Sequence, residues 1–169
     1  MQSLPSQEEK ISFEEIAERK GYSPKRAERK RFKDVSHILK AKGQDGNPID
    51  LRFDLKKRKN KKQSEDWIWV EFKNSKGEPG WLHGHAHFIV FEREFDFIVV
   101  NRRELVDFLG SCKKIRYDLP FVTLAKKAKY KIYKRPGKKE EITQINIKDL
   151  ELLKSFKVWD KVNAEQRNS

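Results

Sequence analysis

The segment DWIWVEFKNSKG, residues 66–77, limits most strongly what this chain can fold into. Its apolar and polar residues alternate, and successive side chains of a β-strand point to opposite faces of a sheet. One face is suited to burial, whereas the other ends in a carboxylate and an ammonium group placed side by side. The first face holds Ile68, Val70 and Phe72, and the second holds Trp67, Trp69, Glu71 and Lys73.

The composition allows one folded domain with an anionic partner. Of the 169 residues 36% are hydrophobic, with 11 Phe, 4 Trp and 4 Tyr, which is enough for a core. Charged residues make up 38%, and the formal net charge is +13. So large an excess of one sign favours a polyanionic partner, with nucleic acid ahead of an anionic membrane.

A single cysteine, Cys112, excludes an internal disulfide framework and a cysteine-based zinc site. The simplest inference is a reducing, cytoplasmic compartment. The first residues, MQSLPSQEEK, lack an apolar signal core, and no run of about 18 apolar residues could span a bilayer. We therefore expect a cytoplasmic protein that has no membrane partner.

Capping residues and apolar periodicity predict an α/β or α+β fold, with a mixed central sheet flanked by helices. Ser12 and Glu15 form a capping box for a first helix, and Asn101 and Glu104 form one for a later helix. Pro136 and Gly137 mark the turn of a C-terminal hairpin. Helices are expected over 12–20, 23–42, 101–110 and 148–156, and strands over 49–55, 67–73, 88–91, 95–100, 129–135 and 140–147.

Strands 49–55 and 67–73 are predicted to pair as an antiparallel hairpin closed by a basic loop. Asp50 then lies opposite Glu71, and the loop keeps about six residues. Directly opposed carboxylates repel each other, and Mg²⁺ or Mn²⁺ between them would relieve that repulsion. Asp54 could replace Asp50 only with a shorter ladder, so it ranks second.

Lys73 and Glu28 complete the predicted site. Lys73 follows Glu71 on the same strand face, where it could bind a phosphate oxygen or hold an attacking water. The alternative is a solvated Glu–Lys pair on an open strand face. Glu28 lies four residues before Phe32 on the core stripe of the predicted helix 23–42, so it could support the metal. A solvated glutamate at a helix N-terminus is the alternative.

Three short motifs resemble, in order and spacing, the PD-(D/E)XK nuclease superfamily, which includes Holliday-junction resolvases and restriction enzymes. The stretch from VEFK (residues 70–73) to residue 110 is also similar to uncharacterised phage nuclease-like proteins. The helix that the family places after the lysine strand has no counterpart between residues 74 and 87. The motifs are AERKRF at 27–32, PID at 48–50 and VEFK at 70–73.

This resemblance implies a metal-dependent DNA endonuclease of phage or mobile-element type with a restriction-endonuclease-like core. Asp50, Glu71 and Glu28 would hold Mg²⁺ or Mn²⁺, and Lys73 would join them in catalysis. A phage-encoded protein would act in the host cytoplasm. The expected parts are a flexible N-terminus with a short helix (1–22), a nuclease-like core (23–110) and a hairpin–helix extension packed on that core or forming a homodimer surface (111–169).

Two other functions stay open at this point. The same fold without chemistry would be a catalytically inactive nucleic-acid-binding or inhibitory module. Alternatively, the chain is an RNA-associated factor in which Glu71 and Lys73 form an ordinary surface pair.

The HGHAH stretch places His83, His85 and His87 at alternating positions, so a strand would present all three on one face. They could then bind zinc, contact a phosphate or transfer a proton. The alternatives are a half-exposed strand edge, or a loop in which Gly84 breaks the geometry.

Clusters of Lys and Arg predict a sequence-independent phosphate-binding surface with steep salt dependence. A solvated face is the ordinary interpretation of any single basic run. Trp67, Trp69 and Trp81 could stack on bases or pack in the core. The predicted nucleic-acid contacts are Lys56, Lys57, Arg58, Lys59, Lys61, Lys62, Arg102 and Arg103.

Overall fold

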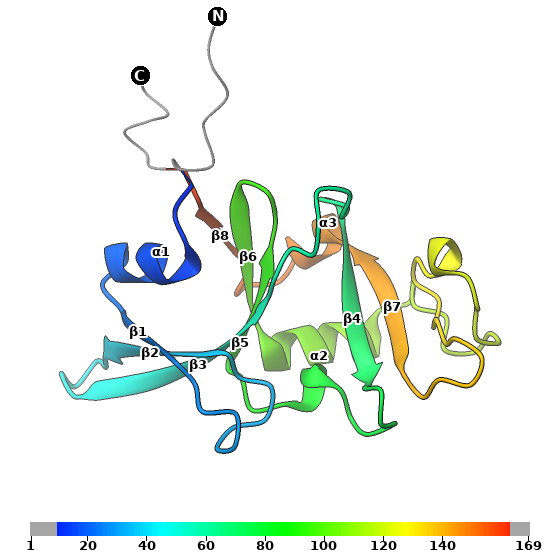
Figure 1. Ribbon diagram of the computed structural model, residues 1–169, viewed down its shortest axis with the longest axis horizontal. Coiled ribbons are helices and arrows are strands. Elements are labelled where there is room, and N and C mark those ends of the chain that lie inside the picture. Colours follow the sequence, from blue (N-terminus) through cyan, green and yellow to red (C-terminus); the bar gives the residue numbers. More distant parts are fainter. Residues whose placement is uncertain (1–9, 163–169) are drawn as a thin grey trace, which may run out of the picture.

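The computed structural model describes residues 10–162, which form a six-stranded mixed sheet, a two-stranded sheet and three α-helices (Figure 1). The large sheet has the order β1-β2-β3-β5-β6-β8; only β3 and β5 run parallel, and β4 pairs with β7 in the small sheet. The expected α+β class is confirmed. The strands are β1 (Ser23–Arg26), β2 (His37–Lys42), β3 (Pro48–Lys56), β4 (Trp67–Lys73), β5 (Phe88–Glu92), β6 (Asp96–Asn101), β7 (Glu141–Asn146) and β8 (Lys157–Asp160), and the helices are α1 (Phe13–Arg19), α2 (Arg102–Ser111) and α3 (Ile147–Leu150), with 3-10 turns at Trp81–His83 and Ala125–Lys127.

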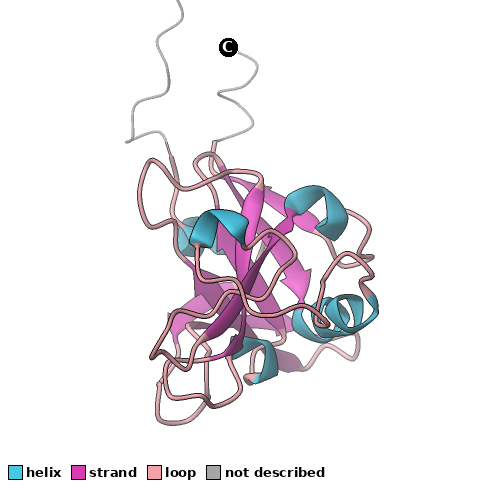
Figure 2. Ribbon diagram, turned by 90° about the vertical axis from the view of Figure 1, so that its right-hand side faces the viewer, coloured by secondary structure: helices cyan, strands magenta, loops and turns pink. Residues whose placement is uncertain are grey.

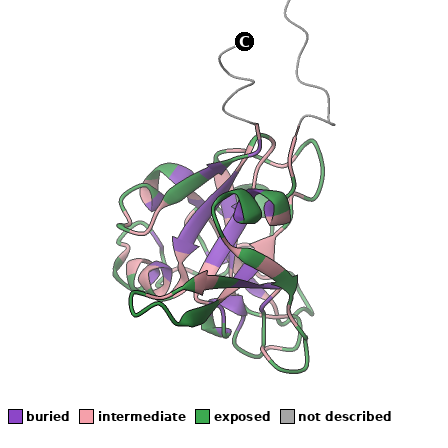
Figure 3. Ribbon diagram, turned by 90° about the vertical axis from the view of Figure 1, so that its left-hand side faces the viewer, coloured by how far each residue is buried: buried purple, intermediate pink, exposed green. Residues whose placement is uncertain are grey.

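Both faces of the large sheet are covered, and the helices lie around the outside of the strands (Figure 2). On one face, Phe13 of α1 packs against Phe97 and Val99 of β6. On the other face, Ile98 and Val100 pack in a second core with α2 and the small sheet. Burial is therefore concentrated in the central strands (Figure 3).

The capping residues position two helices as predicted. Ser12 Oγ accepts a hydrogen bond from the Glu15 N–H at 3.2 Å, and α1 follows. Asn101 Oδ1 accepts one from the Glu104 N–H at 3.0 Å, and α2 follows. The helix expected over 148–156 is confirmed only in its first turn, α3. No helix within residues 10–162 is long and apolar enough to cross a membrane.

The helix predicted over 23–42 is wrong. These residues form β1, a connecting turn and β2, which pair as an antiparallel hairpin. Pro24 fits because β1 is the edge strand of the sheet. In β2, His37, Ile38 and Leu39 are all buried, since neighbours cover both of its faces. Such a strand shows no alternation that would distinguish it from a helix.

The predicted hairpin of β3 with β4 is also wrong. β3 pairs with β2 and β5, so Asp50 lies opposite Lys40. β4 pairs with β7, so Glu71 lies opposite Ile142. The basic segment between β3 and β4 therefore crosses from one sheet to the other.

The C-terminal part of the chain supplies a strand to each sheet: β7 pairs with β4 and β8 with β6. The predicted C-terminal hairpin is reduced to one antiparallel bridge, in which Tyr133 and Ile142 exchange main-chain hydrogen bonds of 2.7 and 3.2 Å. A second bridge between the two segments, Lys129 with Gln144, is parallel. Most of the N-terminal segment that we expected to be flexible, residues 1–9, lies outside the described residues.

Candidate active site

The structure does not assemble the four residues of the predicted site. Asp50 is exposed on β3, and Glu28 is exposed in the turn after β1. A β-bulge separates Glu71 from Lys73, and Lys73 Nζ lies 3.0 Å from Glu141 Oε2. Of the four, Glu71 is a half-buried carboxylate, and its pKa responds to the charges of Lys56, Glu140 and Asp34.

Asp54, four residues along β3 from Asp50, is the buried acid of this strand. It is only 6% exposed and lies beside Ile89 of β5, on the sheet face that looks toward the small sheet. Lys56, two residues along β3, places Nζ 2.8 Å from Asp54 Oδ2. Burial raises the pKa of Asp54, and the positive charge of Lys56 opposes that rise.

Glu71 extends from β4 toward the same lysine. Burial raises its pKa, whereas the Lys56 charge and a hydrogen bond from the Trp81 N–H lower it. The backbone at Gly80 lies so close that an added Cβ would stand 2.7 Å from Glu71 Oε1. The carboxylate is thus held against the segment that follows β4.

Lys56 is the common neighbour of these two acids, and its ammonium stands 4.8 Å from the centre of the Trp81 ring. Asp34 joins them from the turn before β2: its negative charge raises the pKa of both Asp54 and Glu71. Asp34 has a left-handed backbone (φ 53°), and a Cβ on Gly84 would lie 2.8 Å from its own Cβ. Lys56 and Asp34 therefore act on both Asp54 and Glu71.

The donor chemistry fits a divalent cation. In the conformation described for residues 10–162, no three His, Cys, Asp or Glu side chains form a ready-made metal site. Mg²⁺ commonly uses one or two carboxylates and completes its shell with water and substrate phosphates. Asp54 and Glu71 each offer carboxylate oxygens of this kind near Lys56, and Asp54 Oδ2 has Lys56 Nζ as its partner at 2.8 Å. Mg²⁺ or Mn²⁺ is therefore compatible with this pair.

The three histidines do not share a strand face, because His83 ends a 3-10 turn and Gly84 follows it. His85 Nδ1 accepts a hydrogen bond from the Lys33 N–H at 3.0 Å, and His87 Nδ1 accepts one from the Arg52 N–H at 2.9 Å. Both rings thus join this segment to the turn before β2 and to β3. His85 and His87 therefore have a structural role. The three histidines do not form the one-face arrangement that a zinc site on a strand would need.

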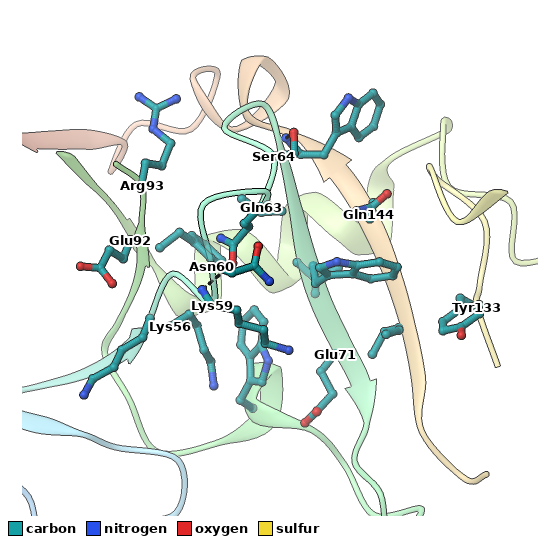
Figure 4. Close-up of a pocket in the computed structure, with 18 of the residues that line it drawn as sticks. Lys56, Lys59, Asn60, Gln63, Ser64, Glu71, Glu92, Arg93, Tyr133 and Gln144 are labelled. Carbon is teal, nitrogen blue, oxygen red and sulfur yellow. Dashed lines mark hydrogen bonds between the residues drawn. The ribbon is translucent and has the colours of Figure 1, made fainter. Parts of the chain in front are cut away.

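A groove of about 880 Å³ opens beside Lys56 and Glu71, which both line it. The basic segment that follows β3 forms one wall, and the outer face of the β4–β7 sheet forms the other, with Lys56 and Lys59 across from Glu71 (Figure 4). Trp67 and Trp69 share that outer face, while Ile68 and Val70 are buried beneath it. The alternation predicted for this strand is confirmed up to the bulge.

The predicted phosphate contacts divide into free and engaged cations. Lys57, Lys59 and Lys62 are exposed and take part in none of the salt bridges found between residues 10 and 162. Arg58 instead faces Glu65 and Glu94 at 3.8 and 3.9 Å. Arg102 donates hydrogen bonds to the carbonyls of Ala86 and Leu82, so its role is structural. Lys61 and Arg103 are exposed.

Sequence reasoning missed Asp34 and Lys56 as partners of the acids. A signal for Lys56 was present, because Asp54-Leu55-Lys56 has the same acid-x-lysine spacing as Glu71-Phe72-Lys73. No signal marked Asp34, which was assigned to the interior of a helix. Comparison with known proteins finds no matching family model, no matching curated protein and no matching solved structure. The geometry of the site is therefore the basis for its function.

Proposed function

We propose that this protein is a metal-dependent nuclease that hydrolyses phosphodiester bonds in DNA, with Asp54, Lys56 and Glu71 as its catalytic residues. The observation that supports it most is the ion pair between buried Asp54 and half-buried Lys56, whose lysine also acts on Glu71. A half-buried acid with a raised pKa that lines a groove, as Glu71 does, is typical of active sites. The proposal keeps the acid-x-lysine pattern of PD-(D/E)XK nucleases but moves it from residues 71–73 to 54–56.

Each side chain has a task in this reaction. Lys56 supplies positive charge to a phosphate oxygen and can hold the attacking water. Glu71, whose pKa is raised, can accept a proton from that water at Oε1 or Oε2. Asp54 holds Lys56 in place, and Asp34 keeps the local field negative, which favours a cation. Bound Mg²⁺ or Mn²⁺, held by Asp54 and Glu71, would neutralise the phosphate and make water more acidic.

Cleavage of supercoiled plasmid and of branched DNA in Mg²⁺ tests this proposal. Asp54→Asn, Lys56→Met and Glu71→Gln should each lower the rate at least about 100-fold. Asp50→Asn and Lys73→Met are matched controls on the same two strands, and both should cleave at nearly the rate of the unmodified protein. Loss of cleavage in the two controls, with cleavage retained in the first three variants, would refute the assignment of the catalytic residues.

A binding module without catalysis is the second candidate. It is favoured by the lack of three assembled metal ligands within residues 10–162. Tight DNA binding with no cleavage in Mg²⁺ or Mn²⁺ by any form of the protein would select this candidate.

A further inference from the structure

We propose that the groove beside the acids binds a single strand of nucleic acid and not a duplex. In this arrangement the bases stack on aromatic rings of the β4–β7 sheet, and the phosphates follow lysines of the segment after β3. The inference rests on the proposed function, because the bound strand would be the substrate whose phosphate reaches Lys56.

Aromatic side chains supply the stacking surface. Trp69 of β4 and Tyr133 stand with ring centres 5.9 Å apart and planes tilted by 50°. Trp67 meets the Tyr130 ring edge-on at 5.5 Å. Both tryptophans are only partly buried, while Val70, on the opposite face of β4, is fully buried. Trp67, Trp69 and Tyr133 line the groove, whereas Tyr130 contacts Trp67 outside that lining.

The opposite wall carries unneutralised positive charge. Lys57, Lys59 and Lys62 are exposed on it. The carboxylates that also line the groove have partners of their own: Glu92 Oε2 lies 2.9 Å from Lys161 Nζ, and Glu140 lies 3.6 Å from Arg135. The net field in the groove is therefore positive, which matches a phosphate backbone.

The lysine wall is also ordered before any ligand binds. The Lys59 N–H donates to Gln63 Oε1 at 2.9 Å (Figure 4), and the Lys62 N–H donates to Asn60 Oδ1 at 2.9 Å. Arg58 anchors the segment by donating its N–H to Glu92 Oε1 at 2.8 Å. A preordered wall loses less conformational entropy on binding.

Base accessibility decides between one strand and two. A duplex hides its base faces inside the stack, so it could use the lysines but not the rings. A single strand offers both its phosphates and its base faces, and stacking tolerates any sequence. The groove volume of about 880 Å³ also lies in the range of sites that enclose a few rings. The combined walls thus match a single strand.

Fluorescence anisotropy in EDTA tests the inference without cleavage. The probes are a labelled 12-nucleotide DNA without self-complementarity, the RNA of the same sequence, and the duplex of each. At least one single strand should bind about tenfold or more tightly than its own duplex, and the pair of strands distinguishes DNA from RNA. Equal or tighter binding of both duplexes would overturn the inference.

Trp69→Ala should weaken strand binding about tenfold and duplex binding less than twofold, because stacking is lost. Trp69→Phe keeps a ring and should retain most of the affinity, which separates stacking from misfolding. Phe121→Ala, at an aromatic ring that is exposed outside the groove, is the control and should change nothing. Equal effects of Trp69→Ala and Phe121→Ala would contradict the stacking surface.

The two proposals fail separately. Strand preference without metal-dependent cleavage would remove the nuclease and leave the groove assignment standing. Cleavage that depends on Asp54 and Lys56, combined with no strand preference, would remove the groove assignment alone.

Discussion

Gly80→Ala should reduce both stability and cleavage, because Gly80 packs directly on Glu71. An added Cβ would lie 2.6 Å from the Glu71 carbonyl oxygen and 2.7 Å from its Cγ and Oε1. Ordinary contact begins at 3.4 Å, so these atoms must separate by about 0.7 Å. The carbonyl belongs to β4, which is paired with β7, and the Gly80 N–H donates to Phe72 O at 3.0 Å. The backbone therefore has little freedom to move.

Such overpacking costs about 2 kcal/mol of unfolding free energy, or about 4–8 °C in Tm for a chain of this size. Displacing Glu71 by most of an ångström should also slow cleavage about 100-fold. Urea unfolding followed by tryptophan fluorescence measures the first effect, and plasmid cleavage in Mg²⁺ measures the second.

Gly110→Ala is the control, because a Cβ on this glycine of α2 meets nothing within 4 Å. It should leave cleavage unchanged and stabilise the fold by at most about 1 kcal/mol. A Gly80→Ala protein with an unchanged urea midpoint and cleavage rate would refute the packing argument. Lost stability with full activity would instead show that Glu71 takes no part in catalysis.

Three further predictions concern stability. Asp54→Asn should raise Tm at neutral pH, because burial raises the folded-state pKa of Asp54 and its ionisation then disfavours the fold; in melts from pH 3 to 8 the gain should shrink as the pH falls through the raised folded-state pKa and be absent below the ordinary value of 3.8. Arg102→Leu should cost about 2–3 kcal/mol in urea unfolding, since it removes donors 2.7 Å from Ala86 O and 2.8 Å from Leu82 O, whereas exposed Arg103→Leu should stay within about 0.5 kcal/mol. Ser12→Ala should lower the unfolding free energy by about 1 kcal/mol through loss of the α1 cap, and an unchanged urea midpoint would refute this.

Local chemistry made part of the fold predictable from the sequence. The caps at Ser12 and Asn101 specify helices α1 and α2 because their side-chain oxygens satisfy nearby N–H groups. The alternation in β4 follows from a strand with one buried face. The 23–42 segment was not predictable in this way, because β2 is buried on both faces and an edge strand tolerates Pro24.

Strand pairing was not predictable, since the partners are distant along the chain. Neighbouring strands suggested a hairpin, yet β4 pairs with β7, whose residues follow some 70 positions later. β3 takes β5 as a parallel neighbour. The error in pairing accounts for the shift of the proposed site by four residues along β3, from Asp50 to Asp54. Glu71 stays in the proposed site, and its strand β4 was predicted correctly.

Burial distinguishes the two acid-x-lysine stretches, which the sequence alone could not rank. Lys73 is 54% exposed and pairs with Glu141 of β7, whereas Lys56 is 32% exposed and pairs with the acid of its own stretch, Asp54. Asp54 is buried, and its raised pKa means that its ionised form disfavours folding even beside Lys56. A fold retains such a cost where function requires it, because a neutral residue there would be more stable. That difference is our reason for proposing residues 54–56 as the catalytic acid-x-lysine pair, with Glu71 as a second acid.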